Sequence, residues 1–429
     1  MLADKEPSRE ELPAGWTATR LGDICTEIQR RTGSVELPVL SVTKHQGMVR
    51  SSDYFGRRVH SADISNYKVV AKRQLAYATI HLNEGSIGLL RDLDAGLVSP
   101  MYTVFSVKEG SVLPEYLYAV LKQPSSLGLF QTLVQGTVNR RGAIPFARFA
   151  QLFLIHPPLE EQHKIASILS SVDETIEKTQ IVVEQLNIVK RGFLRELLTQ
   201  GMPGQHSKYK MTPVGSMPDD WECVTLASVL ERIDTGWSPL CEPQPAHLGE
   251  WGVLKVSSVS WGEFKPEENK RLPLGVSPRP ETEVCEGDLL VSRANTRELV
   301  GRSVLVKSTP PKLMASDKLL RLRPIAQRAT SAFINYALSS DCSREQIEEA
   351  ATGSSGSMKN ISQERIRSIL IPRPSVNEQK DIAAVLDSIS DRIQGEVAVL
   401  HELRDIKSVL MELLLSGAVR VRFPSQEVA

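Results

Sequence analysis

The sequence predicts a mixed α/β protein in which two globular domains are joined by two long antiparallel helices that form a coiled coil. Three observations support this prediction. A segment at residues 157–169 returns at residues 374–386. Each copy continues into a long helical pattern, and strand-like runs precede each copy. A chain of 429 residues is also too long for one ordinary domain.

The repeat extends well beyond this segment and gives the chain a pseudo-twofold internal symmetry. Residues 144–198 align with residues 361–415 without a gap, at an offset of 217. Each half also opens alike, with LPAGW at residues 12–16 and MPDDW at residues 217–221. The offset is 205 here, so the second half is 12 residues longer between its head and its helix. The two halves therefore have similar ends and divergent middles.

Each long helix carries apolar residues at alternating steps of four and three, which is the a/d seam of a heptad repeat. In the first helix these are Ile165, Leu169, Val172, Ile176, Val183, Leu186, Phe193 and Leu197. In the second they are Ile382, Leu386, Ile389, Ile393, Leu400, Leu403, Leu410 and Leu414. Polar residues fill the weaker positions, namely Thr179, Lys190, Glu396 and Lys407.

Such a seam has two interpretations. It is either an ordinary core stripe or the contact face of an intramolecular coiled coil. Two equally long helices in one chain favour the coiled coil, and the globular segment between them favours antiparallel packing. Pro157, Pro158 and Pro374 end the secondary structure that precedes each long helix, because proline blocks the hydrogen bonds of a helix or a strand ladder. Gly201 and Gly417 end the long helices. Some 38 residues make a rod of roughly 55–60 Å, which suits a spacer of about one to one-and-a-half turns of DNA.

The middles predict strands and one short helix each. The predicted strands are residues 37–42, 253–259, 289–292, 304–306 and 319–322, and the predicted short helices are residues 113–121 and 331–338. The predicted organisation is a first domain at 1–157, a helix at 158–201, a linker at 202–216 rich in Gly, Pro, Ser and Lys, a second domain at 217–373, a helix at 374–417 and a tail at 418–429.

Composition narrows the class of protein. Hydrophobic residues make up 41% and charged residues 24%, as in soluble globular proteins, and no apolar run is long enough to span a membrane. The polar N-terminus predicts no secretory signal. The five scattered cysteines form no CxxC pair, so we expect no metal site, no disulfide framework and a cytoplasmic protein with free thiols. No P-loop, HExxH or GxSxG motif is present, and we expect no catalytic residue in this chain.

Charge is balanced overall but uneven along the chain. There are 51 basic and 51 acidic residues, which counts mildly against an autonomous nucleic-acid binder. Between Leu289 and Arg328, however, the sequence has nine Lys or Arg residues and only two acidic residues. Within this stretch Arg293, Asn295, Thr296 and Arg297 follow a predicted strand. Arginine can form bidentate hydrogen bonds with guanine, and asparagine can do so with adenine. These four residues are therefore candidates for DNA contact.

A Gly/Ser loop precedes the second long helix and has a polar counterpart before the first. Its candidate DNA-binding residues are Ser354, Ser355, Lys359 and Asn360, and those of the counterpart are Asn139, Arg140 and Arg141. Exposed backbone N–H groups and cations suit a phosphate backbone. A solvated polar face is the alternative interpretation, but loops matched at the same offset in both halves favour DNA binding.

Together, the repeated E-Q-x-x-I-A signature, the L-P-x-x-W head and GDLLVSRANT at residues 287–296 resemble the specificity subunits of type I restriction–modification enzymes. The resemblance covers about residues 12–417. It implies that each middle is a target recognition domain for one half of a bipartite, asymmetric DNA sequence, and that the helices set the spacer between the halves.

The resemblance also implies partners. Two methyltransferase subunits would bind the similar ends and helices and would carry S-adenosylmethionine, and restriction subunits would complete the complex. This chain would have neither a cofactor nor an active site of its own. The alternatives are a standalone DNA methyltransferase or endonuclease, which would transfer label from the cofactor or cut DNA alone, and a purely structural scaffold without sequence preference.

Overall fold

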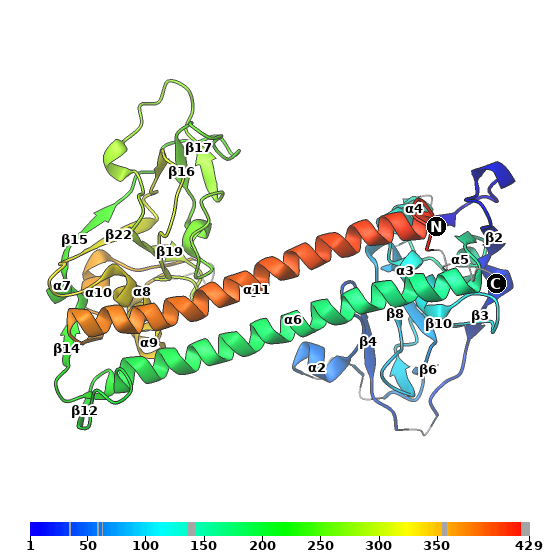
Figure 1. Ribbon diagram of the computed structural model, residues 1–429, viewed down its shortest axis with the longest axis horizontal. Helices are drawn as coiled ribbons and strands as arrows, with labels where there is room; N and C mark the ends of the chain where they lie inside the picture. Colours follow the sequence, from blue (N-terminus) through cyan, green and yellow to red (C-terminus); the bar gives the residue numbers. More distant parts are fainter. Residues whose placement is uncertain (34–35, 58–59, 62, 136–141, 354–357, 422–429) are drawn as a thin grey trace, which may run out of the picture. The chain divides into compact units, whose positions relative to one another are not determined.

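The computed structural model describes residues 1–33, 36–57, 60–61, 63–135, 142–353 and 358–421. The chain divides into two compact units, the first formed by Met1–Ile181 with Ala398–Ala429 and the second by Val182–Val397. The two long helices, α6 (Leu159–Gln200, green in Figure 1) and α11 (Val376–Ser416, orange to red), each contribute one part to each unit. No helix among the described residues has the length and hydropathy to cross a membrane.

The first unit is built on an antiparallel sheet in the order β3-β10-β7-β8. These strands are Cys25–Ile28, Tyr102–Val107, Leu75–Ala78 and Ile87–Leu89. A second sheet has the order β1-β11-β2 (Leu2–Ala3, Phe153–His156 and Thr17–Arg20), and two further pairs are β4-β5 (Leu40–Thr43 with Gly47–Arg50) and β6-β9 (Lys68–Ala71 with Ala95–Val98). The helical segments are η1 (Arg9–Glu11), α1 (Leu21–Ile24), α2 (Ser51–Phe55), η2 (Leu82–Glu84), α3 (Pro114–Leu121), α4 (Pro124–Gln135) and α5 (Phe146–Phe149).

The second unit has a sheet of the same order, β15-β22-β18-β20. Its strands are Leu230–Thr235, Leu319–Pro324, Leu289–Ser292 and Ser303–Leu305. The other sheets are β14-β24 (Glu222–Thr225 and Leu370–Arg373), β17-β16-β21 (Asn269–Arg271, Gly252–Leu254 and Leu313–Met314), β12-β13 (Tyr209–Thr212 and Gly215–Pro218) and β19-β23 (Ala294–Asn295 and Lys359–Asn360). The helical segments are α7 (Leu226–Val229), η3 (Val256–Val259), η4 (Pro280–Thr282), α8 (Ser331–Ser339), α9 (Asp341–Ala350) and α10 (Gln363–Arg367).

The matching sheets confirm the predicted duplication and the mixed α/β class, and they locate the 12 additional residues. Leu289 of β18 stands where Leu75 of β7 stands, at an offset of 214, whereas β22 follows β10 at the offset of 217. Nine of the additional residues therefore lie before β18 and three lie between β18 and β22. The predicted strand at 253–259 was wrong in its second half, where η3 forms instead. There Ser258 Oγ donates to the Lys255 carbonyl, a local bond that competes with strand pairing.

The long helices run antiparallel within each unit. In the first unit the start of α6 shares a core with the end of α11, through Ile165 and Leu169 against Leu414 and Leu415. In the second unit the end of α6 shares a core with the start of α11, where Leu197 and Leu198 join Ile382 and Leu386.

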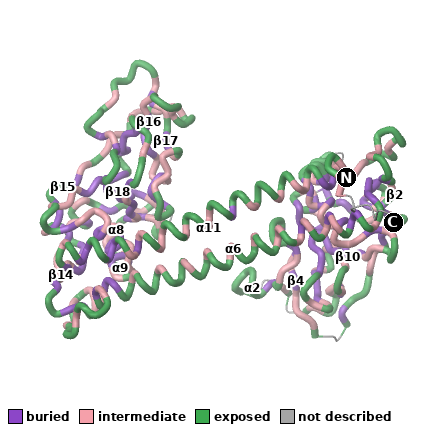
Figure 2. The backbone as a smooth tube through the Cα atoms, viewed as in Figure 1, coloured by how far each residue is buried: buried purple, intermediate pink, exposed green. Residues whose placement is uncertain are grey.

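Burial along the predicted seam is greatest where the helices meet the cores of the units. Leu400 is also buried, whereas Val172, Ile176, Val183, Leu186, Ile389, Ile393 and Leu403 are half-buried (Figure 2). The seam prediction was wrong at Phe193, which is 40% exposed, while its neighbour Leu194 packs on the core. A straight helix repeats every 3.6 residues, so a strict heptad pattern drifts to the wrong face.

A repeated glutamine ties each long helix to the middle of its unit. Gln162 is fully buried, and its Oε1 accepts from the backbone N–H of Leu113, which precedes α3. Gln379 is equally buried and accepts in the same way from the N–H of Thr330, which precedes α8. Each glutamine also donates to the carbonyl of the proline that precedes its own helix, Pro157 or Pro374. These bonds explain why this residue type recurs at the helix start.

The neighbouring glutamate ties the same helix to the segment that follows the other long helix. In the first unit both carboxylate oxygens of Glu161 accept from the guanidinium of Arg420 at 2.8 Å. In the second unit Glu378 accepts from Trp221 Nε1 at 2.9 Å and faces His206 Nε2 at 2.7 Å. We call each Glu-Gln pair with these partners a clasp. Each clasp joins the N-terminus of one long helix to the end of the other.

Core packing at the start of α11 should dominate the stability of the second unit. Replacing Leu386, which is fully buried, by alanine leaves a cavity and should lower the free energy of unfolding by about 2–5 kcal/mol. The control Ile406→Ala, at a position that is 50% exposed, should cost about 0.5 kcal/mol or less. Urea unfolding of the isolated chain checks both values. Equal costs would contradict this assignment of the core.

The clasp of the second unit should respond to pH. Burial by itself lowers the pKa of His206, but the hydrogen bond and charge of Glu378, together with Asp220, outweigh it, so the pKa is raised from 6.5. Both ring nitrogens face carboxylates, with Nδ1 3.0 Å from Asp220 Oδ1. Protonation of His206 therefore stabilises the folded unit. Its contribution is complete below the unfolded value and is lost as the pH rises through the folded value.

The matched variant is His206→Gln, which carries no charge at any pH. Wild type should exceed the variant in Tm at pH 5.5, and the difference should shrink by roughly 2–4 °C by pH 8.5, the shift produced by about 1 kcal/mol in a unit of this size. Thermal unfolding at a series of pH values measures the difference. A constant difference across the series would show that His206 does not act through its charge.

Candidate nucleic-acid interface

The structure brings together the two predicted DNA-binding segments of the second unit. β19 and β23 pair antiparallel, with Ala294 opposite Asn360 and Asn295 opposite Lys359. The carbonyl of Arg293 accepts from the N–H of Ile361 at 2.9 Å. Ser354 and Ser355 lie outside the described residues, as do Asn139, Arg140 and Arg141 of the first unit.

A buried arginine fixes the loop that follows β19. Arg344 on α9 donates to the carbonyl of Val300 at 2.9 Å and to that of Glu298 at 3.2 Å. Burial lowers the pKa of Arg344 to about 10, so the side chain stays charged at neutral pH. Gly301 has a φ of +68°, and a Cβ there would lie 2.6 Å from Ile347. The loop is thus held against α9 by a charge-assisted contact and by a close approach that only glycine allows.

The candidate side chains in this region differ in how far they are already engaged. Asn295 donates from Nδ2 to Ser260 Oγ at 2.9 Å, and Arg297 Nε faces Glu348 at 3.3 Å. Lys359 Nζ donates to the Gly353 carbonyl at 2.6 Å, and the buried Oγ1 of Thr296 has no partner among the described atoms. Arg293 is exposed, and no carboxylate of the described residues forms an ion pair with it. Arg293 is therefore the most available of these groups.

Residues that sequence reasoning missed lie beside Arg293. The N–H of Arg293 donates to the carbonyl of Lys318, an exposed residue just before β22. The end of β15 reaches the same segment, because Trp237 N–H donates to the Ala315 carbonyl at 2.9 Å. A Cβ on Gly236 would lie 2.1 Å from that carbonyl, so only glycine fits there. The sequence offers one signal here, the Gly that directly follows a strand. That signal points to neither Trp237 nor Lys318.

We call the group formed by Gly236, Trp237, Arg293, Lys318 and Lys359 the strand-end edge of the second unit. It gathers the end of β15, the loop after β18 and the residues just before β22. Three of its members carry positive charge, and a tryptophan lies among them. Cations with an aromatic residue at the ends of strands can contact both phosphates and bases.

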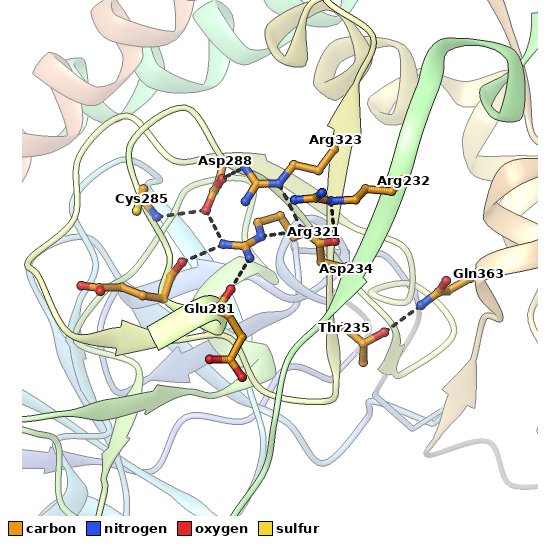
Figure 3. A network of polar contacts seen from close by, with 10 residues as sticks. Arg232, Asp234, Thr235, Glu281, Cys285, Asp288, Arg321, Arg323 and Gln363 are labelled. Carbon is orange, nitrogen blue, oxygen red and sulfur yellow. Dashed lines mark hydrogen bonds and ion pairs between the residues drawn. The ribbon is translucent and has the colours of Figure 1, made fainter. Parts of the chain in front are cut away.

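Not all of the basic residues counted in the sequence belong to this edge. Arg321 is buried and donates to Asp288 Oδ2 at 3.1 Å and to the carbonyls of residues 281 and 283 (Figure 3). Arg323 pairs with the other oxygen of Asp288 at 2.8 Å. Lys307 pairs with Asp387 and Asp391 on α11. The local positive charge therefore divides between a structural network and the surface.

The first unit has the same scaffold with different side chains. Ile144 N–H donates to the carbonyl of Thr79 at 2.9 Å, as Ile361 donates to Arg293. Thr79 therefore occupies the place of Arg293, and the sheet registers, continued by one residue, put Met101 at the place of Lys318. Met101 is 63% exposed. Equivalent positions thus offer a hydroxyl and a thioether in one unit and two cations in the other.

Comparisons with known proteins agree with this two-unit architecture. The family model for the type I restriction modification DNA specificity domain matches residues 13–185 and 218–403. The specificity subunit of the type I restriction enzyme MjaVIII from Methanocaldococcus jannaschii is 26% identical over 97% of this chain and 96% of its own length. The specificity subunit of EcoEI from Escherichia coli is 34% identical, but the match covers 49% of this chain and spans about a third (36%) of that relative.

Two solved structures share the fold. The S subunit of a type I restriction-modification system from M. genitalium aligns with a TM-score of 0.58 and 12% identity, covering 96% of this chain and 99% of that one. A chain from a type I R-M system, described in terms of complex assembly and conformational transition, aligns with a TM-score of 0.53 and 17% identity over 96% and 100%. Because the family model matches both units over most of their length, this chain belongs to the family of type I restriction modification DNA specificity domains.

Proposed function

We propose that this chain is the non-catalytic DNA-recognition subunit of a type I restriction–modification complex, in which each unit reads one half of a bipartite, asymmetric target. The observation that carries the proposal is the pair of equivalent strand-end positions with different chemistry. Thr79 and Met101 stand in one unit where Arg293 and Lys318 stand in the other. One scaffold presented twice with different side chains suits two different half-sites, and the long helices set the unread spacer.

The exposed apolar residues of the long helices support a pair of protein partners. In the second unit Val182, Ile188, Val189 and Phe193 of α6 are each at least 37% exposed. In the first unit Val399, Ile406, Val409 and Leu413 of α11 are each at least 36% exposed. We call each group the outer stripe of its unit. Apolar side chains repeated along one helix suit burial against another helix.

The two outer stripes match each other in the repeat at two of their four positions. Val182 corresponds to Val399 and Val189 to Ile406 at the offset of 217. Similar surfaces in both units suit two copies of one partner, and we propose methyltransferase subunits that carry S-adenosylmethionine. The methyl transfer then belongs to the partner, and restriction subunits join the assembly formed by these proteins. The free thiols of the five cysteines support a cytoplasmic location.

Arg293→Ala should relax the preference for one position of the second half-site by about 1–3 kcal/mol if its guanidinium forks onto a base. Competition binding with duplexes that vary one position at a time measures this. The control is Arg232→Ala, an exposed arginine of β15 that faces Asp234 at 3.0 Å and lies outside the strand-end edge. An equal loss of affinity on all duplexes would instead make Arg293 a phosphate contact.

Placing a charge on either outer stripe should remove one methyltransferase subunit. Val189→Asp should leave only the partner on the first unit, Ile406→Asp should leave only the partner on the second, and the double variant should bind none. We expect each single change to weaken its own site at least about tenfold, roughly 1.4 kcal/mol. Light scattering of the mixed subunits gives the stoichiometry. Ser408→Asp adds the same charge to α11 outside the stripe and serves as control. Two bound partners in the double variant would refute the assignment.

A further inference from the structure

One arginine near the strand-end edge lies over an aromatic ring. The guanidinium carbon of Arg279 lies 4.5 Å from the centre of the Trp237 ring. Trp237 itself packs on a small core formed by Val253, Leu272 and Met314. The backbone of Arg279 is fixed as well, because its carbonyl accepts from both the N–H and the Oγ1 of Thr282, at 2.9 and 2.8 Å. Backbone and side chain of Arg279 are therefore both positioned.

The backbone N–H of Arg279 donates to Met314 Sδ at 3.2 Å, whereas its guanidinium has no hydrogen-bond acceptor among the described residues. The residue is exposed, and no carboxylate of the described residues forms an ion pair with it. Other arginines of the unit are engaged: Arg271 donates to Glu242 at 2.9 Å, and Arg321 is buried against Asp288. A guanidinium placed over an indole, with no acidic partner, keeps its N–H groups available and is positioned before any ligand arrives.

The position of this pair connects it to Arg293. The N–H of Trp237 donates to the carbonyl of Ala315 and the N–H of Arg293 donates to that of Lys318, so the residue beneath Arg279 and Arg293 itself are both bonded to one segment of four residues. The Cα atoms of residues 315 and 318 are at most ~10–11 Å apart, about three base-pair steps. Asp317 is the one acid in that segment, and it accepts a hydrogen bond from Ser238. Arg279, Lys318 and Arg293 are thus three cations connected through one short segment.

We infer that Arg279, oriented by Trp237, reads a guanine of the second half-site through N7 and O6. The inference rests on the proposed function and adds a specificity-determining residue to it. A guanidinium held in one place over a ring can present two N–H donors to the two acceptors of a guanine edge, whereas a phosphate contact needs charge but no such placement. The first unit differs at this point: beyond the bulge between Leu230 and Arg232 the sheet registers give an offset of 206, so Arg31 takes the place of Trp237.

The test uses the intact chain in complex with its methyltransferase subunits and a duplex library randomised in the second half-site. Wild type should require guanine at one position. Arg279→Ala should lose this preference by roughly five- to 100-fold and leave the first half-site unchanged. Arg279→Lys keeps the charge without the fork, and should fail to restore the preference. Trp237→Leu keeps an apolar group on the small core and should weaken the same position, with Tm reporting on folding.

Lys270→Ala, on β17 of the same small sheet, removes an equal charge and should leave the preference intact. Two results would overturn the inference while leaving the proposed function in place: an unchanged preference in Arg279→Ala, or an equal loss on all duplexes that Arg279→Lys restores. Absence of any preference in wild type would instead contradict the proposed function itself.

Discussion

The architecture depends on the Glu-Gln clasp at the start of each long helix. A glutamine with no exposed surface must satisfy both its amide hydrogens and its carbonyl oxygen within the protein. Gln162 and Gln379 do so by bonding to the backbone just before a short helix and to the proline before their own helix. The adjacent glutamate adds the segment that follows the opposite helix. Three parts of the chain, distant in sequence, are thereby fixed at one point in each unit.

This constraint explains why the ends of the two halves are similar and the middles are not. The clasps and the helix ends make the same contacts in both units, so the same residue types recur there. The strand-end positions take no part in these contacts and differ, with Thr79 in one unit and Arg293 in the other. Even the clasps differ in one respect, because Arg420 engages Glu161 where His206 engages Glu378. The first pairing keeps its charge over the physiological pH range, whereas the second changes with the protonation of His206.

Sequence reasoning predicted the parts of the chain that repeat and missed the tertiary contacts. The signature marked Gln162 and Gln379, but their bonds to Leu113 and Thr330, about fifty residues upstream, are tertiary and leave no local pattern. Arg293 could be found because it follows a clear strand. The engagement of Arg297 by Glu348 and the stacking of Arg279 on Trp237 join residues about forty to fifty positions apart, and no periodicity marks them. At Phe193 the heptad pattern failed, because helical geometry rather than strict spacing decides which face is buried.

The central claim is that one scaffold, present twice, reads two different half-sites. Selection of bound sequences from a fully randomised duplex library, using the complex of this chain with its methyltransferase subunits, tests it most directly. The expected result is an asymmetric site of two specified blocks separated by a spacer of fixed length and free sequence. A single continuous block, two identical blocks, or no preference at all would contradict it.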